Sequence, residues 1–375
     1  MPPSMPPSML APMPNGHSCQ RRNRRCRGMC LALYSEQRFG NPGEEAMRGR
    51  RTLLTTVAAL TAFAATLGLT TVPAAAEVEV RFSYETPPAH IKSRTIELFA
   101  QLLEEKSEGY YNVRLFPAAQ LVGPAEEVAA TARGQIEMSA PYFSYLASIE
   151  PLMNIYQVPL VFDSYEQLWD FLATDDAADL AARLERRGLQ HIEYWFESPS
   201  RLWTQAPVRS VADLRGQKIR VVPSAILQDA VAAMGATPTA IPGTELYLAL
   251  QQGVADGAFT APTYGLTFKF FEVSNAITNL DLFYGGYFFM VNKNWFDRQP
   301  PERQEQIRAA AAEARAFNQI EVQKDLAMVD DALAAEGMEV IQMTPELLAE
   351  FRTALEGFYA GLDSELQALI AIAQE

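Results

Sequence analysis

From residue 78 onward, apolar and polar positions follow the periods of strands and helices in turn. Residues 78–84 alternate, which predicts a strand that ends at the loop Thr86-Pro87-Pro88. Apolar side chains from Ile91 to Leu103 then follow helical spacing. The same patterns predict strands at 112–116 and 136–139 and a helix at 124–133. Such alternation is typical of an open α/β sheet, whose ligand loops lie at the carboxyl ends of the strands.

A second α/β lobe is predicted to begin near Pro199, after a helix at 164–187 and a strand at 191–195. A strand at 287–291 is predicted to return to the first lobe, so the chain crosses between the lobes at least twice and forms a hinge. The predicted strands of the second lobe are 202–205, 218–222 and 258–260, and its predicted helices are 225–234 and 245–252. The expected boundaries are 77–198 plus 286–324 for lobe I, and 199–285 plus 325–375 for lobe II.

Residues 302–336 contain neither glycine nor proline and carry an apolar stripe at helical spacing. A helix over these residues is about 50 Å long at 1.5 Å per residue. Since this exceeds the width of one small lobe, the helix is expected to brace both. Thr344 as N-cap, with Pro345 at the first helical position, predicts a last helix that runs toward Ile372.

The first 76 residues divide into two segments. Residues 1–46 are low-complexity sequence without the periodicity of a packed element. From Met47, three arginines precede the uncharged, mildly apolar run 53–72 and an A-x-A cleavage site at 74–76. This pattern predicts a signal peptide over 47–76, with residues 1–46 as a non-native extension and Glu77 as the first mature residue.

A transmembrane anchor is the alternative interpretation of the run 53–72. The run is rich in Thr, Ala and Gly and leads directly into the cleavage site, which favours the signal peptide. Arg50-Arg51 also resembles a twin-arginine export signal, so the Sec and twin-arginine routes both stay open. Either route predicts a periplasmic protein.

Charge is distributed unevenly along the 375 residues. Residues 1–76 hold nine of the 31 basic residues but only three of the 45 acidic ones, so residues 77–375 carry a formal charge of about −20. An acidic surface of this kind repels phosphate backbones, and nucleic acid is excluded as a partner. Hydrophobic residues make up 49% of the chain, enough for a sizeable core.

Few residues are available for catalysis or metal binding. The three cysteines (Cys19, Cys26 and Cys30) all precede the body, and the body holds only His90 and His191. The sequence contains no G-x-S-x-G, no phosphate-binding loop and no H-E-x-x-H. We therefore expect neither an enzyme nor a cofactor or metal.

From about Val78 to Ile372, the order of segments resembles the solute-binding proteins of tripartite ATP-independent periplasmic (TRAP) transporters, in particular the DctP-like, four-carbon-dicarboxylate type. The segments that carry the resemblance are Phe116-Pro117 with Gln120–Gly123, Val158–Phe162, Val211–Val221, Met234–Pro238, Glu245–Gly257 and Val291-Asn292-Lys293. The resemblance implies a two-lobed fold of the periplasmic-binding-protein type. It also implies a small organic acid in the cleft, which the protein delivers to the membrane subunits of a transporter.

The resemblance also implies which residues bind the ligand. Arg220 matches the family arginine that pairs with the ligand carboxylate, and a guanidinium offers two parallel donors to such a group. The strand pattern alone favours a solvated face shared by Lys218 and Arg220 over a binding role. Arg201 matches a second family arginine, with a surface strand arginine as the alternative. Trp203 either stacks on the ligand or packs the lobe.

Three departures from the family pattern leave fewer polar residues in the expected lining of the cleft. Thr260 stands where dicarboxylate-type proteins have Asn, and Phe259 replaces a Glu; Leu282 stands near a position often held by His. A less polar or aromatic monocarboxylate is therefore expected in place of a four-carbon diacid. Candidate aromatic walls are Tyr84, Tyr142, Phe143, Tyr264 and Tyr284. Alternatives for the whole chain are a periplasmic sensing subunit for a signalling receptor and, third, a lyase or hydrolase on the same scaffold.

Overall fold

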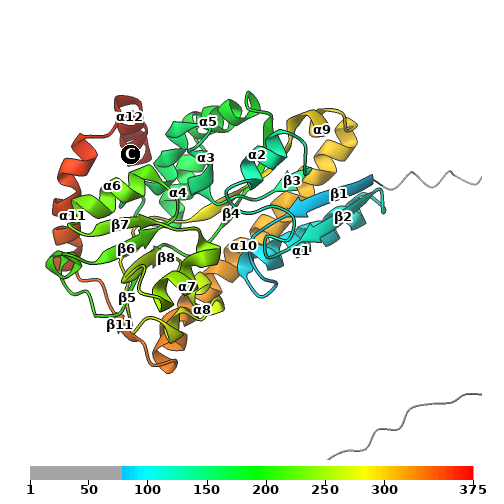
Figure 1. Cartoon of the computed structure of the whole chain (residues 1–375). Coiled ribbons are helices and arrows are strands. Elements are labelled where there is room, and N and C mark those ends of the chain that lie inside the picture. Colours follow the sequence, from blue (N-terminus) through cyan, green and yellow to red (C-terminus); the bar gives the residue numbers. More distant parts are fainter. Residues whose placement is uncertain (1–77, 375) are drawn as a thin grey trace, which may run out of the picture. The chain divides into compact units, whose positions relative to one another are not determined.

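The computed structural model describes residues 78–374, which form two sheets covered by helices (Figure 1). The predicted signal peptide and the segment before it lie outside the described residues. The first sheet has the order β2-β1-β3-β10-β4. Its strands are β1 (Val78–Ser83), β2 (Tyr111–Phe116), β3 (Met138–Ser139), β4 (Leu189–Phe196) and β10 (Gly286–Asn292).

The second sheet has the order β11-β9-β5-β8-β6-β7. Its strands are β5 (Arg201–Thr204), β6 (Lys218–Val221), β7 (Thr237–Ala240), β8 (Gly257–Thr260), β9 (Ala276–Thr278) and β11 (Glu339–Ile341). Strand β6 is parallel to β7 and β8, whereas β5 is antiparallel to β8 and β9. The expected two-lobed α/β architecture is confirmed, and β10 returns to the first sheet between β3 and β4 as predicted.

Twelve α-helices surround the sheets in the described part of the chain. They are α1 (Ile91–Lys106), α2 (Glu127–Ala132), α3 (Phe143–Leu146), α4 (Tyr165–Leu172), α5 (Asp175–Glu185), α6 (Ala225–Ala233), α7 (Leu246–Gln251), α8 (Pro262–Thr267), α9 (Lys293–Asp297), α10 (Pro301–Ala335), α11 (Pro345–Ala360) and α12 (Ser364–Ala373). Within residues 78–374, no helix combines the length and the apolar character that crossing a membrane requires.

Two predicted helices are interrupted. The helix expected over 164–187 divides into α4 and α5 because Thr174 caps the second helix: its side chain accepts from the N–H of Ala177, and Asp175 and Asp176 fill the first turn. The last helix likewise divides, since α11 ends at Gly361 and the Asp363 side chain caps α12. The helix predicted from residue 124 begins only at Glu127.

Two hinge segments and one long helix connect the sheets. Residues 197–200 lead from β4 to β5, and residues 279–285 lead from β9 to β10. These segments are hydrogen-bonded to each other, since Ser200 N–H donates to Phe283 O at 2.9 Å and Glu197 N–H to Gly285 O at 3.1 Å. Helix α10 contacts α1 and β4 beside the first sheet and α8 and β11 beside the second. It therefore braces both lobes, as its length predicted.

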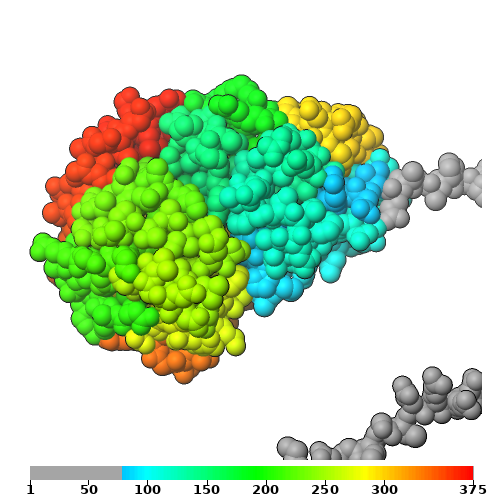
Figure 2. Space-filling model, viewed as in Figure 1, coloured from blue at the N-terminus to red at the C-terminus, as the bar shows by residue number. Residues whose placement is uncertain are grey.

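The hydrophobic core consists of one buried cluster in each lobe and a third cluster with residues from both. One buried cluster packs Phe82, Phe99, Trp195 and Phe289 between the first sheet and the helices α1 and α10. Another packs Trp203 and the residues around it beneath the second sheet. On the face shown in Figure 2, the cyan-to-teal and green-to-yellow-green segments meet along a seam.

Candidate functional site

A cavity of about 50 Å³ lies beyond the carboxyl ends of strands from both sheets. Glu85 follows β1, Val222 follows β6, and Ala261 follows β8, so the position agrees with the general rule for open α/β sheets. This volume has room for several groups of water size. The lining residues are Glu85, Pro124, Tyr142, Tyr145, Glu197, Ser200, Arg220, Val222, Gly243, Phe259, Thr260, Ala261, Tyr264, Phe283 and Tyr287.

Arg220 is the lining residue with the most unusual surroundings. It is 1% exposed on β6, yet no carboxylate forms an ion pair with it within the described residues. Its Nε donates to the Ile241 carbonyl at 2.7 Å, and its Nη1 to the Phe259 carbonyl at 3.3 Å. Nη2 has no hydrogen-bond partner among residues 78–374. Because burying an unpaired charge is costly, this arrangement indicates a site prepared for an anion.

The backbone carbonyls hold the guanidinium in a fixed orientation. Burial lowers the pKa of Arg220, and the neighbouring Tyr264, Tyr145 and Tyr142 act in the opposite direction. A guanidinium nevertheless stays charged in proteins, since its ordinary pKa exceeds 12. One donor edge of a permanent cation is thus held at the cavity wall.

Two further polar atoms of the cavity wall lack partners. Ser200 Oγ and Tyr264 Oη are buried and, like Arg220 Nη2, accept or donate no hydrogen bond within the described part of the chain. Buried polar atoms are almost always paired in folded proteins. Three unpaired atoms around a single cavity therefore indicate that a polar ligand completes their hydrogen bonds.

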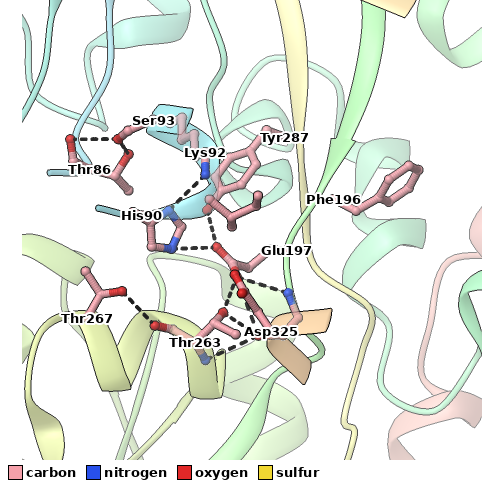
Figure 3. A network of polar contacts seen from close by, with 12 residues as sticks. Thr86, His90, Lys92, Ser93, Phe196, Glu197, Thr263, Thr267, Tyr287 and Asp325 are labelled. Carbon is pink, nitrogen blue, oxygen red and sulfur yellow. Dashed lines mark hydrogen bonds and ion pairs between the residues drawn. The ribbon is translucent and has the colours of Figure 1, made fainter. Parts of the chain in front are cut away.

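Glu197 joins the two lobes beside this cavity (Figure 3). Its Oε1 accepts from Thr263 Oγ1 at 2.6 Å, on α8 of the second lobe. Its Oε2 accepts from Tyr287 Oη at 2.7 Å and lies 2.8 Å from His90 Nε2, both in the first lobe. Burial raises the pKa of this carboxyl, but His90 and then the hydrogen bonds from Thr263 and Tyr287 outweigh it and lower the pKa to about 2. Glu197 is therefore ionised and couples the lobes.

A second charged cluster lies next to Glu85. The ammonium of Lys92 is fully buried, forms an ion pair with Glu85 and lies 4.6 Å from the centroid of the Tyr287 ring. Glu127 is also fully buried, and neither of its carboxylate oxygens finds a hydrogen-bond partner within residues 78–374. Burial raises its pKa well above the usual range, although Lys92 opposes this, so the protonated form is favoured.

Two glycines make room for the tyrosine walls. A Cβ on Gly285 would lie 2.2 Å from Tyr142 Oη, and a Cβ on Gly243 would lie 2.7 Å from Tyr264 Oη. Both distances are shorter than van der Waals contact. Glycine at these positions therefore lets the two phenol groups reach the cavity.

Three of the residues predicted to contact ligand line the cavity: Arg220, Thr260 and Tyr142. The other three do not. Arg201 donates to Asp281 at 2.6 Å, to Asp330 at 2.9 Å and to Asn279 at 3.1 Å, so its charge is neutralised within the fold. Trp203 is fully buried against Gly265 and Phe270, which agrees with its packing alternative. Tyr84 packs edge-to-face on Phe82 in the core of the first lobe.

Among the other candidate walls, Tyr264 lines the cavity, whereas Phe143 and Tyr284 belong to the core. Leu282 is buried and donates its N–H to the Ser200 carbonyl at 2.9 Å, away from the lining. Sequence reasoning did not find Glu85, Tyr145, Glu197, Ser200, Phe283 and Tyr287. Their common signal is a place at the end of a strand or in a hinge segment, and this signal is shared by many residues without a function.

Neither catalytic nor metal chemistry is indicated by the geometry. No group of three His, Cys, Asp or Glu side chains suited to a metal occurs within the described residues. His90 accepts the N–H of Lys92 at its Nδ1, as the N-cap of α1, and is 1% exposed. The imidazole is enclosed between Glu197 and Tyr264, although a histidine shortly after two prolines is typical of a surface loop.

Comparison with known proteins identifies the family. The profile described as "Bacterial extracellular solute-binding protein, family 7" matches residues 82–365. The chain is 29% identical over 302 residues to the C4-dicarboxylate-binding periplasmic protein DctP of Rhodobacter capsulatus, covering 79% of this chain and 88% of the relative. It is 30% identical over 264 residues to the 2,3-diketo-L-gulonate-binding periplasmic protein YiaO of Escherichia coli, covering 70% and 80%.

Solved structures agree. A TRAP periplasmic solute-binding protein from Sulfurospirillum deleyianum with bound succinate has a TM-score of 0.74 and 28% identity, and the match covers 79% of this chain and 98% of that one. DctP7 of Bordetella pertussis, which binds pyroglutamic acid, has the same fold with a TM-score of 0.74 at 23% identity, over 80% of this chain and 100% of that one. The chain therefore belongs to family 7 of the bacterial extracellular solute-binding proteins, as a solute receptor of the TRAP type and not an enzyme.

Proposed function

We propose that this protein binds a small organic acid in the cavity between its lobes, with the ligand carboxylate on Arg220. The observation that carries the proposal is a buried guanidinium at the cavity wall that finds no counterion, and no partner for its Nη2, among residues 78–374. A carboxylate at this position supplies the missing charge and accepts charge-assisted hydrogen bonds. The unpaired hydroxyls of Ser200 and Tyr264 supply further hydrogen bonds to the same ligand.

The lining favours one carboxylate over two. Phe259 brings only its carbonyl to Arg220, and Thr260 offers a single hydroxyl to the cavity. Arg220 is the one basic residue of the lining, whereas Glu85 and Glu197 are both acidic. Although relatives are named for C4-dicarboxylates, a second carboxylate in this cavity meets no cation of its own. We therefore assign a monocarboxylate to this receptor.

Ligand contacts from both lobes stabilise the closed form. Arg220, Thr260 and Tyr264 lie in the second lobe, and Tyr142 and Tyr145 lie in the first. The membrane subunits of a TRAP transporter are the proposed partner, because they receive the ligand from the closed receptor. A periplasmic location, reached through the signal peptide at 47–76, fits relatives that are named periplasmic.

Native mass spectrometry of protein purified from the periplasm identifies the acid that it carries. Calorimetric titration of that acid into the wild type and Arg220→Gln then tests the anchor. We expect binding to the wild type and a loss of at least about 30-fold in the variant. Equal affinity within about threefold contradicts the proposal.

A further inference from the structure

The charged residues around the cavity indicate more about the ligand than Arg220 does alone. Besides Arg220, the lining contains the acidic side chains of Glu85 and Glu197 and six aromatic rings. We propose that the ligand is amphoteric: its carboxylate binds Arg220, and a cationic nitrogen lies among the aromatic rings and faces Glu85. This inference rests on the proposed function and adds the substrate class to it.

Glu197, one of the two acidic residues of the lining, already has partners within the fold. The N–H of Lys92 donates to His90 Nδ1 at 3.2 Å, and Nε2 of the same imidazole lies 2.8 Å from Glu197 Oε2. Thr263 and Tyr287 donate hydrogen bonds to the Glu197 carboxylate.

The Lys, Arg and Glu side chains of the site balance in number. Lys92 and Arg220 supply two positive charges, and Glu85 and Glu197 supply two negative charges. Glu127 adds no positive charge in either protonation state. A simple monocarboxylate leaves one negative charge uncompensated in a buried space, and a dicarboxylate leaves two. A ligand with its own positive charge preserves neutrality.

Tyrosine rings provide the place for the cationic nitrogen of the ligand. Tyr142, Tyr145, Tyr264 and Tyr287 all line the cavity, and the faces of such rings attract cationic nitrogen. Glu85, Tyr142, Tyr145 and Tyr287 come from the first lobe and line the same cavity as Arg220 of the second lobe. Aromatic rings and a carboxylate of the first lobe therefore share the cavity with the proposed anchor.

A matched series of acids tests the inference on the complete mature protein. The probes are butanoate, 4-hydroxybutanoate, 4-aminobutanoate and succinate, which share a four-carbon chain and differ in the distal group. The corresponding sets with three and five carbons cover the unknown length of the site. We expect the amino member of the best-fitting set to bind at least about tenfold more tightly than its methyl member, and the diacid to bind most weakly.

Variants in the first lobe identify the group that recognises the nitrogen. Tyr145→Leu removes a ring and is expected to reduce the preference for the amino member at least threefold, whereas Tyr145→Phe keeps most of it. Glu85→Gln is expected to reduce the same preference and to improve diacid binding. Glu85 also forms an ion pair with buried Lys92. The melting temperature of the unliganded Glu85→Gln variant is therefore measured as well. Glu104→Gln on the exposed face of α1 is the control with the same change in charge.

The outcomes separate this inference from the proposed function. If the methyl or carboxylate member binds as tightly as the amino member and Arg220→Gln abolishes that binding, the receptor function stands and the amphoteric ligand is refuted. Preference for the hydroxyl member over the amino member refutes the cationic nitrogen specifically. If every amino member fails to bind at all three lengths, the inference is also overturned.

Discussion

Replacing Arg220 by Gln separates a ligand anchor from a structural arginine. The guanidinium is fixed by the carbonyls of Ile241 and Phe259 and leaves Nη2 free for a carboxylate. Truncating one partner of a buried, hydrogen-bonded charge pair costs about 2–5 kcal/mol, which corresponds to a loss of about 30-fold to several-thousand-fold in affinity. Arg220→Lys keeps the charge but loses the planar donor geometry, so its affinity is expected to lie between those of wild type and Arg220→Gln.

The unliganded protein is expected to respond differently from the complex. Arg220 has no carboxylate partner within the described residues, so its removal breaks no ion pair and relieves the cost of a buried charge. We therefore expect the melting temperature of unliganded Arg220→Gln to stay within a few degrees of the wild type. A structural salt bridge requires the opposite result.

Arg201 provides the matched control on the neighbouring region of the same sheet. Its side chain is 10% exposed and pairs with Asp281 and Asp330, which are 33% and 34% exposed. Because the partners are partly solvated, Arg201→Gln is expected to cost about 1–3 kcal/mol of stability and to leave ligand affinity within about threefold.

Calorimetric titration and thermal unfolding without ligand measure both properties for both variants. The expected result is a reciprocal pattern: Arg220→Gln loses binding and keeps stability, whereas Arg201→Gln loses stability and keeps binding. Loss of unliganded stability in Arg220→Gln, with binding retained, refutes the assignment of Arg220 as the anchor.

Three further predictions concern other parts of the chain. In Gly285→Ala the new Cβ would lie 2.2 Å from Tyr142 Oη, so Tyr142 is displaced and the ligand affinity measured by calorimetry should fall. Gly357→Ala is the control, because no atom lies near its new Cβ and the affinity should not change. Burial lowers the pKa of His191 to about 3 in the folded protein. Because the imidazole of the unfolded chain binds its proton more readily, the free energy of unfolding falls as the pH drops from about 6.5 toward 3. The wild type should lose free energy of unfolding between neutral pH and about pH 4.5, and His191→Phe should reduce this loss by about 2–3 kcal/mol. Urea unfolding measures it, and an unchanged pH profile would contradict the prediction. The mature protein from the periplasm should begin at or near Glu77 by intact mass, and a product that retains residues 1–46 would refute the signal peptide.

The longer elements were predictable because each shows its own period over many residues. The 35-residue α10 and the strands β1, β4 and β10 all lie where the pattern predicted them. The short strands β7, β9 and β11 were not predicted, whereas the equally short β5, β6 and β8 were, so length alone does not decide whether a strand is recognised. In β7, Pro238 also argues against a strand, but β7 lies at the edge of its sheet, where proline is tolerated.

The Glu197 network was not predictable from local sequence. Its members His90, Glu197, Thr263 and Tyr287 come from four separated segments, and none belongs to a motif of the chain. His90 illustrates the difficulty: a histidine after two prolines is typical of an exposed loop, yet the Nδ1 that caps α1 turns the ring inward. Only the packing of α1 and α8 around the end of β4 brings these residues together.

The two arginines show why charge and strand position do not identify a ligand site. Arg201 and Arg220 each lie on a four-residue strand of the second sheet, and both matched arginines of the family. Residues far away in the chain give the two arginines different surroundings. Asp281 and Asp330 neutralise Arg201, whereas the hydrogen bonds of Arg220 within the described residues go to the carbonyls of Ile241 and Phe259. A buried cation whose neutralising partner is absent from the fold needs that partner from elsewhere. The ligand carboxylate is the partner that the unpaired Nη2 of Arg220 requires.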